Sequence, residues 1–352
     1  MLAGSNLLME FIIKELKSVN NPRSIHGIYP YRGKISALDA EQILSQMPKG
    51  STVLDPFCGS GTIVYEGSKF GLNTIGIDAN PIAVVLSNGK IHIPEQYSRI
   101  EEEIDNLIQK SKDLSDVPQV PEYPRSLFHV DSIDQIMRMS VFYEDMSDYV
   151  KACYLGSIAL TARGCNNYKW TSSTVGKNID PKRYIPFYEK FKQKCKKHFL
   201  PIKNNSRVFY ADSRKMLNYI EPNSIDFVFS SPPYFDCLDY TAYHARIIYD
   251  ILGYERVQIR SSLIQNIENY KEDMSLVLNN LDKVLKPGGQ VIFVVGDKKI
   301  HGQLINGAEY FQAISPFGKY KIIERSYTGT SSKVFDEINK TDRKEQIVIW
   351  TK

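Results

Sequence analysis

Residues 51–62 read Ser-Thr-Val-Leu-Asp-Pro-Phe-Cys-Gly-Ser-Gly-Thr and decide the fold. A short strand with β-branched residues ends at Asp55, a turn with two glycines follows, and residues 63–69 continue with helical spacing. A second short strand, residues 74–77, ends at Asp78. Strand, glycine turn, helix and strand in this order are typical of a doubly wound, mainly parallel α/β sheet, which binds its ligands at the carboxyl ends of the strands.

The glycine turn predicts a cofactor that contains a nucleoside. Glycines let the backbone approach a ligand closely, and Asp78 can accept hydrogen bonds from both hydroxyls of a ribose. The turn lacks the Gly-Lys-Ser/Thr ending of a triphosphate-binding loop, and residues 62–64 do not fit the spacing of a dinucleotide-binding turn. S-adenosylmethionine, which carries no phosphate, is the remaining candidate. A tight turn without a ligand is an alternative that the two glycines alone leave open.

A second motif follows the apolar run of residues 225–229. Residues 230–234 read Ser-Ser-Pro-Pro-Tyr. A proline has no N–H for a strand ladder and fixes its own φ. The two prolines therefore end the strand and hold a stiff loop at its carboxyl end.

Together, residues 55–62 and 231–234 resemble the first and fourth motifs of the amino-methylating DNA methyltransferases, and Ser-Pro-Pro-Tyr is most similar to the cytosine-N4 branch. The resemblance covers residues 22–90 and 206–300. It implies a Rossmann-like sheet, S-adenosylmethionine as cofactor, and a site-specific methylase of a restriction-modification system that acts on N4 of cytosine in DNA. Adenine N6 in DNA and guanine N2 in RNA are alternative acceptors, because related Pro-Pro-Tyr loops act on them.

The resemblance also implies the roles of individual residues. The hydroxyl of Ser231 and the main-chain carbonyl of Pro232 accept the two amine hydrogens, a rigid arrangement that Pro233 maintains. Tyr234 offers a flat face on which an extruded base stacks. Asp78 holds the ribose and Asp212 the adenine amino group. The residues expected to bind the cofactor are Tyr29, Lys34, Asp55, Pro56, Phe57, Gly59, Gly61, Thr62, Asp78, Ala79, Asp212 and Ser213.

The middle of the chain lies outside the resemblance and has mainly helical spacing. We expect three parts, with the cofactor half in residues 1–90, a helical insertion that reads double-stranded DNA in residues 91–205, and the catalytic half in residues 206–352. Residues 182–198 carry seven Lys or Arg against one acid, Glu189, which favours phosphate contact or, equally, a solvated helix face. The expected DNA-binding residues are Arg163, Lys169, Arg183, Lys190, Lys194 and Lys197.

Composition excludes several other classes of protein. The chain has 352 residues, a formal net charge of +4 and five scattered cysteines without a Cys-x-x-Cys pair, so we expect neither a disulfide framework nor a metal site. No cysteine follows a proline, which argues against carbon-5 cytosine methylation. Glu10 interrupts the apolar residues 7–13, so we expect no signal peptide, no membrane span and a cytoplasmic protein.

Two rival functions and two questions about partners stay open. A catalytically silent nucleic-acid-binding module is one rival, and the intact Asp78 and Ser-Pro-Pro-Tyr argue against it. A nicotinamide oxidoreductase is the other, which the spacing of the glycine turn disfavours. The family resemblance implies a companion restriction endonuclease as a partner, and the sequence predicts no particular oligomeric state.

Overall fold

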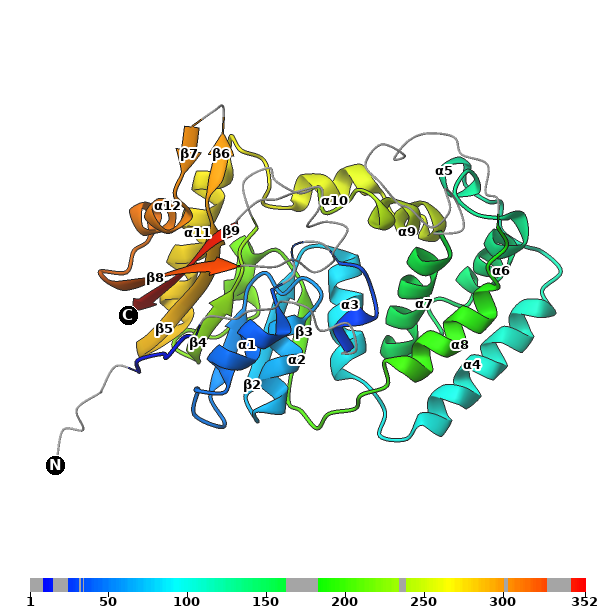
Figure 1. Ribbon diagram of the computed structural model, residues 1–352, viewed down its shortest axis with the longest axis horizontal. Helices are drawn as coiled ribbons and strands as arrows, with labels where there is room; N and C mark the ends of the chain where they lie inside the picture. The colour runs from blue at the N-terminus through cyan, green and yellow to red at the C-terminus, as the bar shows by residue number, and fades with distance from the viewer. Residues whose placement is uncertain are drawn as a thin grey trace.

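The computed structural model describes residues 9–14, 25–31, 33, 35–162, 183–233, 239–300, 303–327 and 343–352. Within these residues, seven strands form one sheet in the order β3-β2-β1-β4-β5-β9-β8, and β6 pairs with β7 in a separate hairpin (Figure 1). The strands are β1 Thr52–Asp55, β2 Asn73–Asp78, β3 Arg207–Tyr210, β4 Ile225–Ser230, β5 Leu285–Gly296, β6 Lys298–Ile300, β7 Gln303–Ile305, β8 Lys319–Tyr327 and β9 Arg343–Thr351.

Helices precede, connect and follow these strands. In chain order they are the 3-10 helix η1 Ile25–Gly27, α1 Ala37–Leu44, α2 Thr62–Lys69, α3 Pro81–Ile91, α4 Tyr97–Lys112, α5 Glu122–Arg125, α6 Val130–Ser140, α7 Asp148–Thr161, α8 Phe187–Lys197, the 3-10 helix η5 Ser213–Asn218, α9 His244–Leu252, α10 Arg256–Ser262, α11 Tyr270–Val284 and α12 Gly307–Ile314.

The sheet is mainly parallel. Strands β1 to β5 run parallel to one another, whereas β9 is antiparallel to both β5 and β8. The strand order reverses between β1 and β4, where Leu54 is opposite Val228. Ligands of open α/β sheets bind at such a reversal, outside the carboxyl ends of the strands. The expected mainly parallel α/β fold is confirmed.

Each face of the sheet buries its own hydrophobic core, because successive strand residues point to opposite sides. Val53 and Phe227 lie in a core with α1, the start of α2 and Phe11 of the N-terminal segment. Leu54 and Val228 lie in a core with α11 and α12 on the other face. Because the helices cover the two faces of the sheet, the carboxyl edge of the parallel strands is covered by the loops that form the site.

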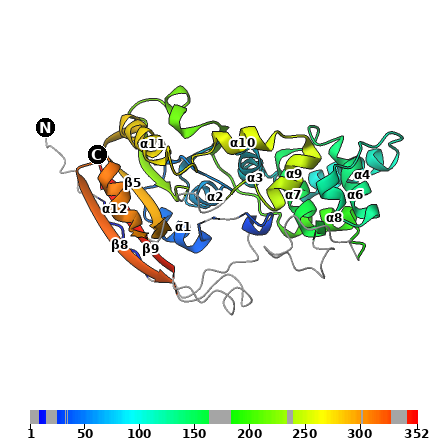
Figure 2. The ribbon, with the colours of Figure 1, turned by 90° about the horizontal axis from the view of Figure 1, so that it is seen from above.

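The helical insertion lies to one side of the sheet in both views (Figures 1 and 2). Helices α4 to α8 share a hydrophobic core with α9 and with α3, which packs against β2 and β3 of the sheet. Helices α3 and α7 approach each other closely: a Cβ on Gly89 would lie 2.4 Å from the Cβ of Ala152 and 2.8 Å from the carbonyl oxygen of Asp148. The insertion is therefore packed directly onto the cofactor half.

In the part of the chain that the structure describes, no helix combines the length and the apolar character needed to span a membrane.

Candidate active site

The glycine turn after β1 is tightly packed. Gly59 and Gly61 have φ angles of +50° and +74°, in the left-handed region that favours glycine. A Cβ on Gly61 would lie 2.7 Å from the hydroxyl oxygen of Ser87 in α3, whereas a Cβ on Gly59 would meet the ring of Tyr31 at 3.1 Å. The N–H of Cys58 donates to the carbonyl of Ile77, which holds the turn against β2. Gly61 is thus needed for helix packing, and Gly59 keeps the space beside Tyr31 open.

Asp78 lies at the carboxyl end of β2 and faces this turn. Its carboxylate accepts hydrogen bonds from the backbone N–H groups of Gly59 and Asn80, both at 2.8 Å. Burial raises the pKa of Asp78 to about 6, although these backbone hydrogen bonds favour the charged form. Two oxygens fixed by backbone groups are suited to accept hydrogen bonds from a diol.

Asp55 connects the glycine turn with the strand that precedes the proline loop. Its Oδ1 atom accepts hydrogen bonds from the hydroxyl of Ser230 at 2.7 Å and from the N–H of Phe57 at 3.2 Å. Burial raises the pKa of Asp55 to about 7, and the nearby charge of Asp78 adds to this shift. Since Ser230 directly precedes Ser231, this contact sets where the proline loop begins.

A cavity of about 630 Å³, open to solvent, lies between these elements. The glycine turn, the end of β2, the start of the proline loop and the end of α10 all contribute to its wall. The lining residues are Tyr31, Gly33, Pro56, Phe57, Gly59, Asp78, Ala79, Asn80, Asp212, Ser213, Ser231, Pro233, Tyr240, Ser262, Leu263 and Ile264.

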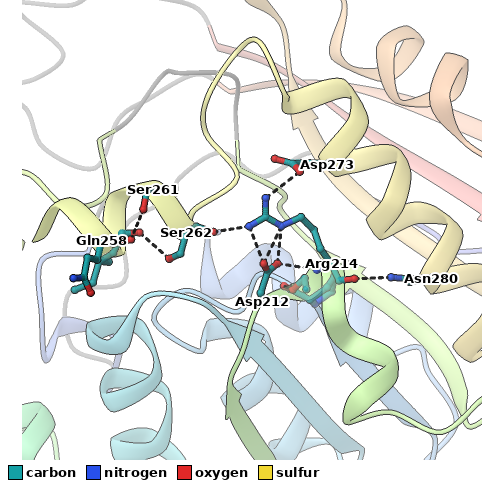
Figure 3. A network of polar contacts seen from close by, with 10 residues as sticks. Asp212, Arg214, Gln258, Ser261, Ser262, Asp273 and Asn280 are labelled. Carbon is teal, nitrogen blue, oxygen red and sulfur yellow. Dashed lines mark hydrogen bonds and ion pairs between the residues drawn. The ribbon is translucent and has the colours of Figure 1, made fainter. Parts of the chain in front are cut away.

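Asp212 lies in the cavity wall just after β3 and is held by Arg214 (Figure 3). Nε of Arg214 donates to both carboxylate oxygens at 2.9 Å, and a terminal nitrogen lies 2.7 Å from Oδ2. Asp212 also accepts the backbone N–H of Arg214 as the cap of η5. The carboxylate therefore has one fixed orientation at the edge of the cavity.

The start of the proline loop forms the opposite wall. Ser231 and Pro233 line the cavity, and Pro232 between them is buried. The hydroxyl of Tyr270, in the first turn of α11, donates a hydrogen bond to the carbonyl of Pro233. This contact adds a fixed anchor to a loop that the prolines already stiffen.

Comparison with known proteins agrees with this arrangement. The family model of the N6/N4 methyltransferases, described as DNA methylase, matches residues 15–88, which contain the glycine turn and Asp78. The predicted resemblance to the amino-methylating DNA methyltransferases is confirmed.

Two curated relatives extend the similarity over most of the chain. Type II methyltransferase M.MjaII of Methanocaldococcus jannaschii is 21% identical over an alignment 405 residues long. The alignment covers 84% of this chain and 76% of that protein. Type II methyltransferase M.BsoBI of Geobacillus stearothermophilus is 24% identical over 370 residues, which cover 92% of this chain and 66% of that protein. A crystal structure of an rRNA methylase from Streptococcus thermophilus has a TM-score of 0.33 and 8% identity, covering 90% of this chain and 97% of that one.

The glycine turn, Asp78 and Asp212 are close together in space. Of the residues expected to bind the cofactor, those that line the cavity are Pro56, Phe57, Gly59, Asp78, Ala79, Asp212 and Ser213. Asp55, Gly61 and Thr62 are buried or tightly packed behind this wall, where they support the turn. Tyr29 lies in an adjoining cavity that shares Tyr31 with this one. Lys34 and the fourth-motif Tyr234 lie outside the described residues.

Of the expected DNA-binding residues, the four that the structure describes do not line this cavity. Arg183 and Lys197 are exposed, and Lys190 contacts Gln193 on the same helix, at 3.1 Å. Lys194 donates a hydrogen bond to the carbonyl of Ile28 at 2.8 Å, which ties α8 to the segment before α1. Arg163 and Lys169 lie outside the described residues.

Two aromatic residues within the basic segment 182–198 have a structural role. Phe187 and Phe191 are fully buried and stack on each other with ring centroids 5.9 Å apart. They lie on the buried face of α8 and are not available to stack on bases.

Several cavity residues were not among the predicted site residues. Tyr31 stacks on Tyr240 with a centroid distance of 6.4 Å and an interplanar angle of 28°, and the two rings form one side of the cavity. Asn80 caps α3 by accepting the N–H of Ile82 at 3.0 Å, and the Asn-Pro pair at 80–81 is the one signal that the sequence offered for it. The end of α10, residues 262–264, reaches the cavity only through the tertiary fold.

Proposed function

We propose that this protein is an S-adenosylmethionine-dependent DNA methyltransferase that methylates N4 of cytosine. One observation carries the proposal: Ser231 and Pro233 of the proline loop line the same cavity as Asp78 and the glycine turn. A nucleoside-binding carboxylate and a loop suited to hold an exocyclic amine therefore face one space.

The residues of the cavity fit S-adenosylmethionine. Asp78 would accept the ribose hydroxyls, and the fixed carboxylate of Asp212 would accept a hydrogen bond from the adenine amino group. Because Gly59 has no Cβ, the space next to the ring of Tyr31 stays open. When bound, the cofactor supplies an electrophilic methyl group on a sulfonium ion.

The proline loop would prepare the amine. The lone pair of an exocyclic amine is delocalised into the base ring, so the nitrogen is a poor nucleophile. Acceptance of its two hydrogens by the hydroxyl of Ser231 and the carbonyl of Pro232 would localise that lone pair. A loop fixed by two prolines and by Tyr270 needs little reorganisation during reaction, which is the basis of electrostatic catalysis.

Proton loss to water fits the surroundings of the loop better than transfer to Asp239. Burial alone would raise the pKa of Asp239, but the hydrogen bonds from Thr241 and the charges of Arg256 and Arg260 outweigh burial and lower it. A carboxylate paired in this way is a weak base. The amine is most acidic after the methyl has arrived, so solvent is a sufficient acceptor at that stage.

The acceptor and the biological role rest on similarity. Ser231 is the residue that favours cytosine over adenine in this proposal, because the amino-methylating family places Ser-Pro-Pro-Tyr in the cytosine-N4 branch. The curated relatives are named Type II methyltransferases. We therefore place the protein in a restriction-modification system, with double-stranded DNA as substrate and a companion endonuclease as partner.

The test is product identification. The protein is incubated with S-adenosylmethionine and mixed double-stranded DNA or RNA, each nucleic acid is digested to nucleosides, and the methylated species is identified by mass. N4-methylcytosine from DNA supports the proposal. N6-methyladenine or a methylated RNA guanine would refute the cytosine assignment, whereas no product together with no cofactor binding by calorimetry would favour a silent nucleic-acid-binding module.

A further inference from the structure

Arg214 joins three elements around the cavity. Its guanidinium binds the carboxylate of Asp212 after β3, donates to Oδ1 of Asp273 in α11 at 3.0 Å, and donates to the carbonyl of Ser262 at the end of α10 at 3.0 Å (Figure 3). The carbonyl of Arg214 accepts the side-chain amide of Asn280, also in α11, at 2.9 Å. Side-chain exposure of Arg214 is only 23%, so these contacts are largely shielded from water.

The two helices that Arg214 contacts also bind the proline loop at Pro233 and the segment after it at Asp239. At the start of the loop, Tyr270 of α11 binds the carbonyl of Pro233. Tyr270 and Asp273 are three positions apart, so they lie on the same face of α11.

After the loop, α10 makes the second anchor. Arg256 donates to Oδ2 of Asp239 and to the carbonyl of Thr241, both at 2.9 Å, and Arg260 lies 3.6 Å from the same carboxylate. Asp239 in turn accepts the N–H and the hydroxyl of Thr241. The segment that leaves the loop is therefore fixed to α10, whose last residue is bound by Arg214.

We propose that Arg214 is a positioning residue of the methyl-transfer site. It fixes the Asp212 carboxylate. It also holds this side of the cavity in a constant position relative to α11, which binds Pro233, and to α10, which binds Asp239 and Thr241. The inference rests on the proposed function, since it assigns Asp212 to the cofactor and the loop to the acceptor. A planar fork with donors in several directions is required for this task, and a lysine at this position cannot bind all three partners at once.

Arg214→Lys is the test variant. Arg138→Lys is the matched control, because Arg138 has a similar exposure of 25%, binds Asp134 and the carbonyl of Leu114 at 2.8 Å, and lies in α6 away from the cavity. At saturating cofactor and DNA, kcat of Arg214→Lys should fall at least ~10-fold, because small misplacements of reacting groups have effects of this size. The affinity for S-adenosylhomocysteine should fall by less, and Arg138→Lys should match the wild type in this affinity.

Hydrogen exchange gives a second readout that does not need catalysis. In the wild type, S-adenosylhomocysteine should slow exchange in peptides that span residues 225–245, and in Arg214→Lys this protection should disappear at saturating ligand. Asp273→Asn, which keeps the pair with Asp212, should lose part of the protection if the first variant does not fold.

The outcomes separate the two proposals. An unchanged kcat with full loop protection in Arg214→Lys, or an equal loss in Arg138→Lys, would overturn the role of Arg214. If the wild type methylates no nucleic acid but the protection still depends on Arg214, the proposed function fails and the positioning role stands.

Discussion

Replacing Asp55 by asparagine tests the electrostatics of the buried site. The amide oxygen of Asp55→Asn can still accept the hydrogen bonds from Ser230 and the N–H of Phe57. The variant removes only the ionisable carboxyl from a position that is 3% exposed. Its effect on stability should therefore depend on pH, which is not expected of a change in packing.

The direction follows from the pKa of the folded state. Burial raises the pKa of Asp55 to about 7 from an ordinary value of 3.8. The folded protein then binds the proton more tightly than the unfolded chain, so stability from this group is greatest at low pH and is lost as the pH rises to about 7. Between pH ~5.5 and pH ~8.5 the free energy of unfolding of the wild type should fall by about 2 kcal/mol, at 1.36 kcal/mol per pKa unit. Asp55→Asn should not show this fall.

Urea unfolding followed by circular dichroism, without cofactor, measures this difference. The free energies of unfolding of wild type and Asp55→Asn are compared at both pH values, so that other titrating groups cancel. The advantage of the variant should grow with pH by about 2 kcal/mol. A difference that stays constant between the two pH values would refute the reasoning, since the carboxylate would then be as well stabilised in the fold as in water.

Three further perturbations test other parts of the site. Asp78→Asn should weaken S-adenosylhomocysteine binding, measured by calorimetry, ~10- to ~100-fold, because a charge-assisted hydrogen bond has a value of this size. The affinity of the wild type should fall as the pH drops through about 6, where this carboxylate gains a proton. Tyr270→Phe should lower kcat about 5- to 10-fold through the lost contact with Pro233, with cofactor affinity unchanged; an equal drop in affinity would contradict a role in the loop. Gly61→Ala should cost about 2 kcal/mol or more in urea unfolding, because the backbone is left-handed and Ser87 fills the space; a smaller cost would mean that α3 yields easily.

The cofactor half of the site was predictable because its signals are local. A strand, a glycine turn and Asp78 lie within one short stretch, and a parallel sheet always brings the carboxyl ends of neighbouring strands to one edge. The same geometry brings the start of the proline loop near Asp55, since β1 and β4 are neighbours in the structure.

The remaining wall was not predictable because tertiary contacts create it. Tyr240 and residues 262–264 belong to segments without a motif, and they reach the cavity only because α10 lies across it. No sequence pattern distinguishes Arg214 from a surface cation, because its three partners belong to separate segments. Helical spacing likewise could not distinguish Lys194, which binds a buried carbonyl, from the exposed Lys197.

The close contact between α3 and α7 has a consequence for protein engineering. Gly89 tolerates no side chain against Ala152, and Gly156 of α7 would place a Cβ 1.9 Å from the carbonyl oxygen of Ile28. A chimaera that exchanges residues 91–205 alone with those of a relative would join two surfaces shaped for other partners. The unit that can be transplanted as a whole includes residues 25–31, α3 and α9 as well, so grafts cut at these wider boundaries should express as folded protein where the shorter ones aggregate.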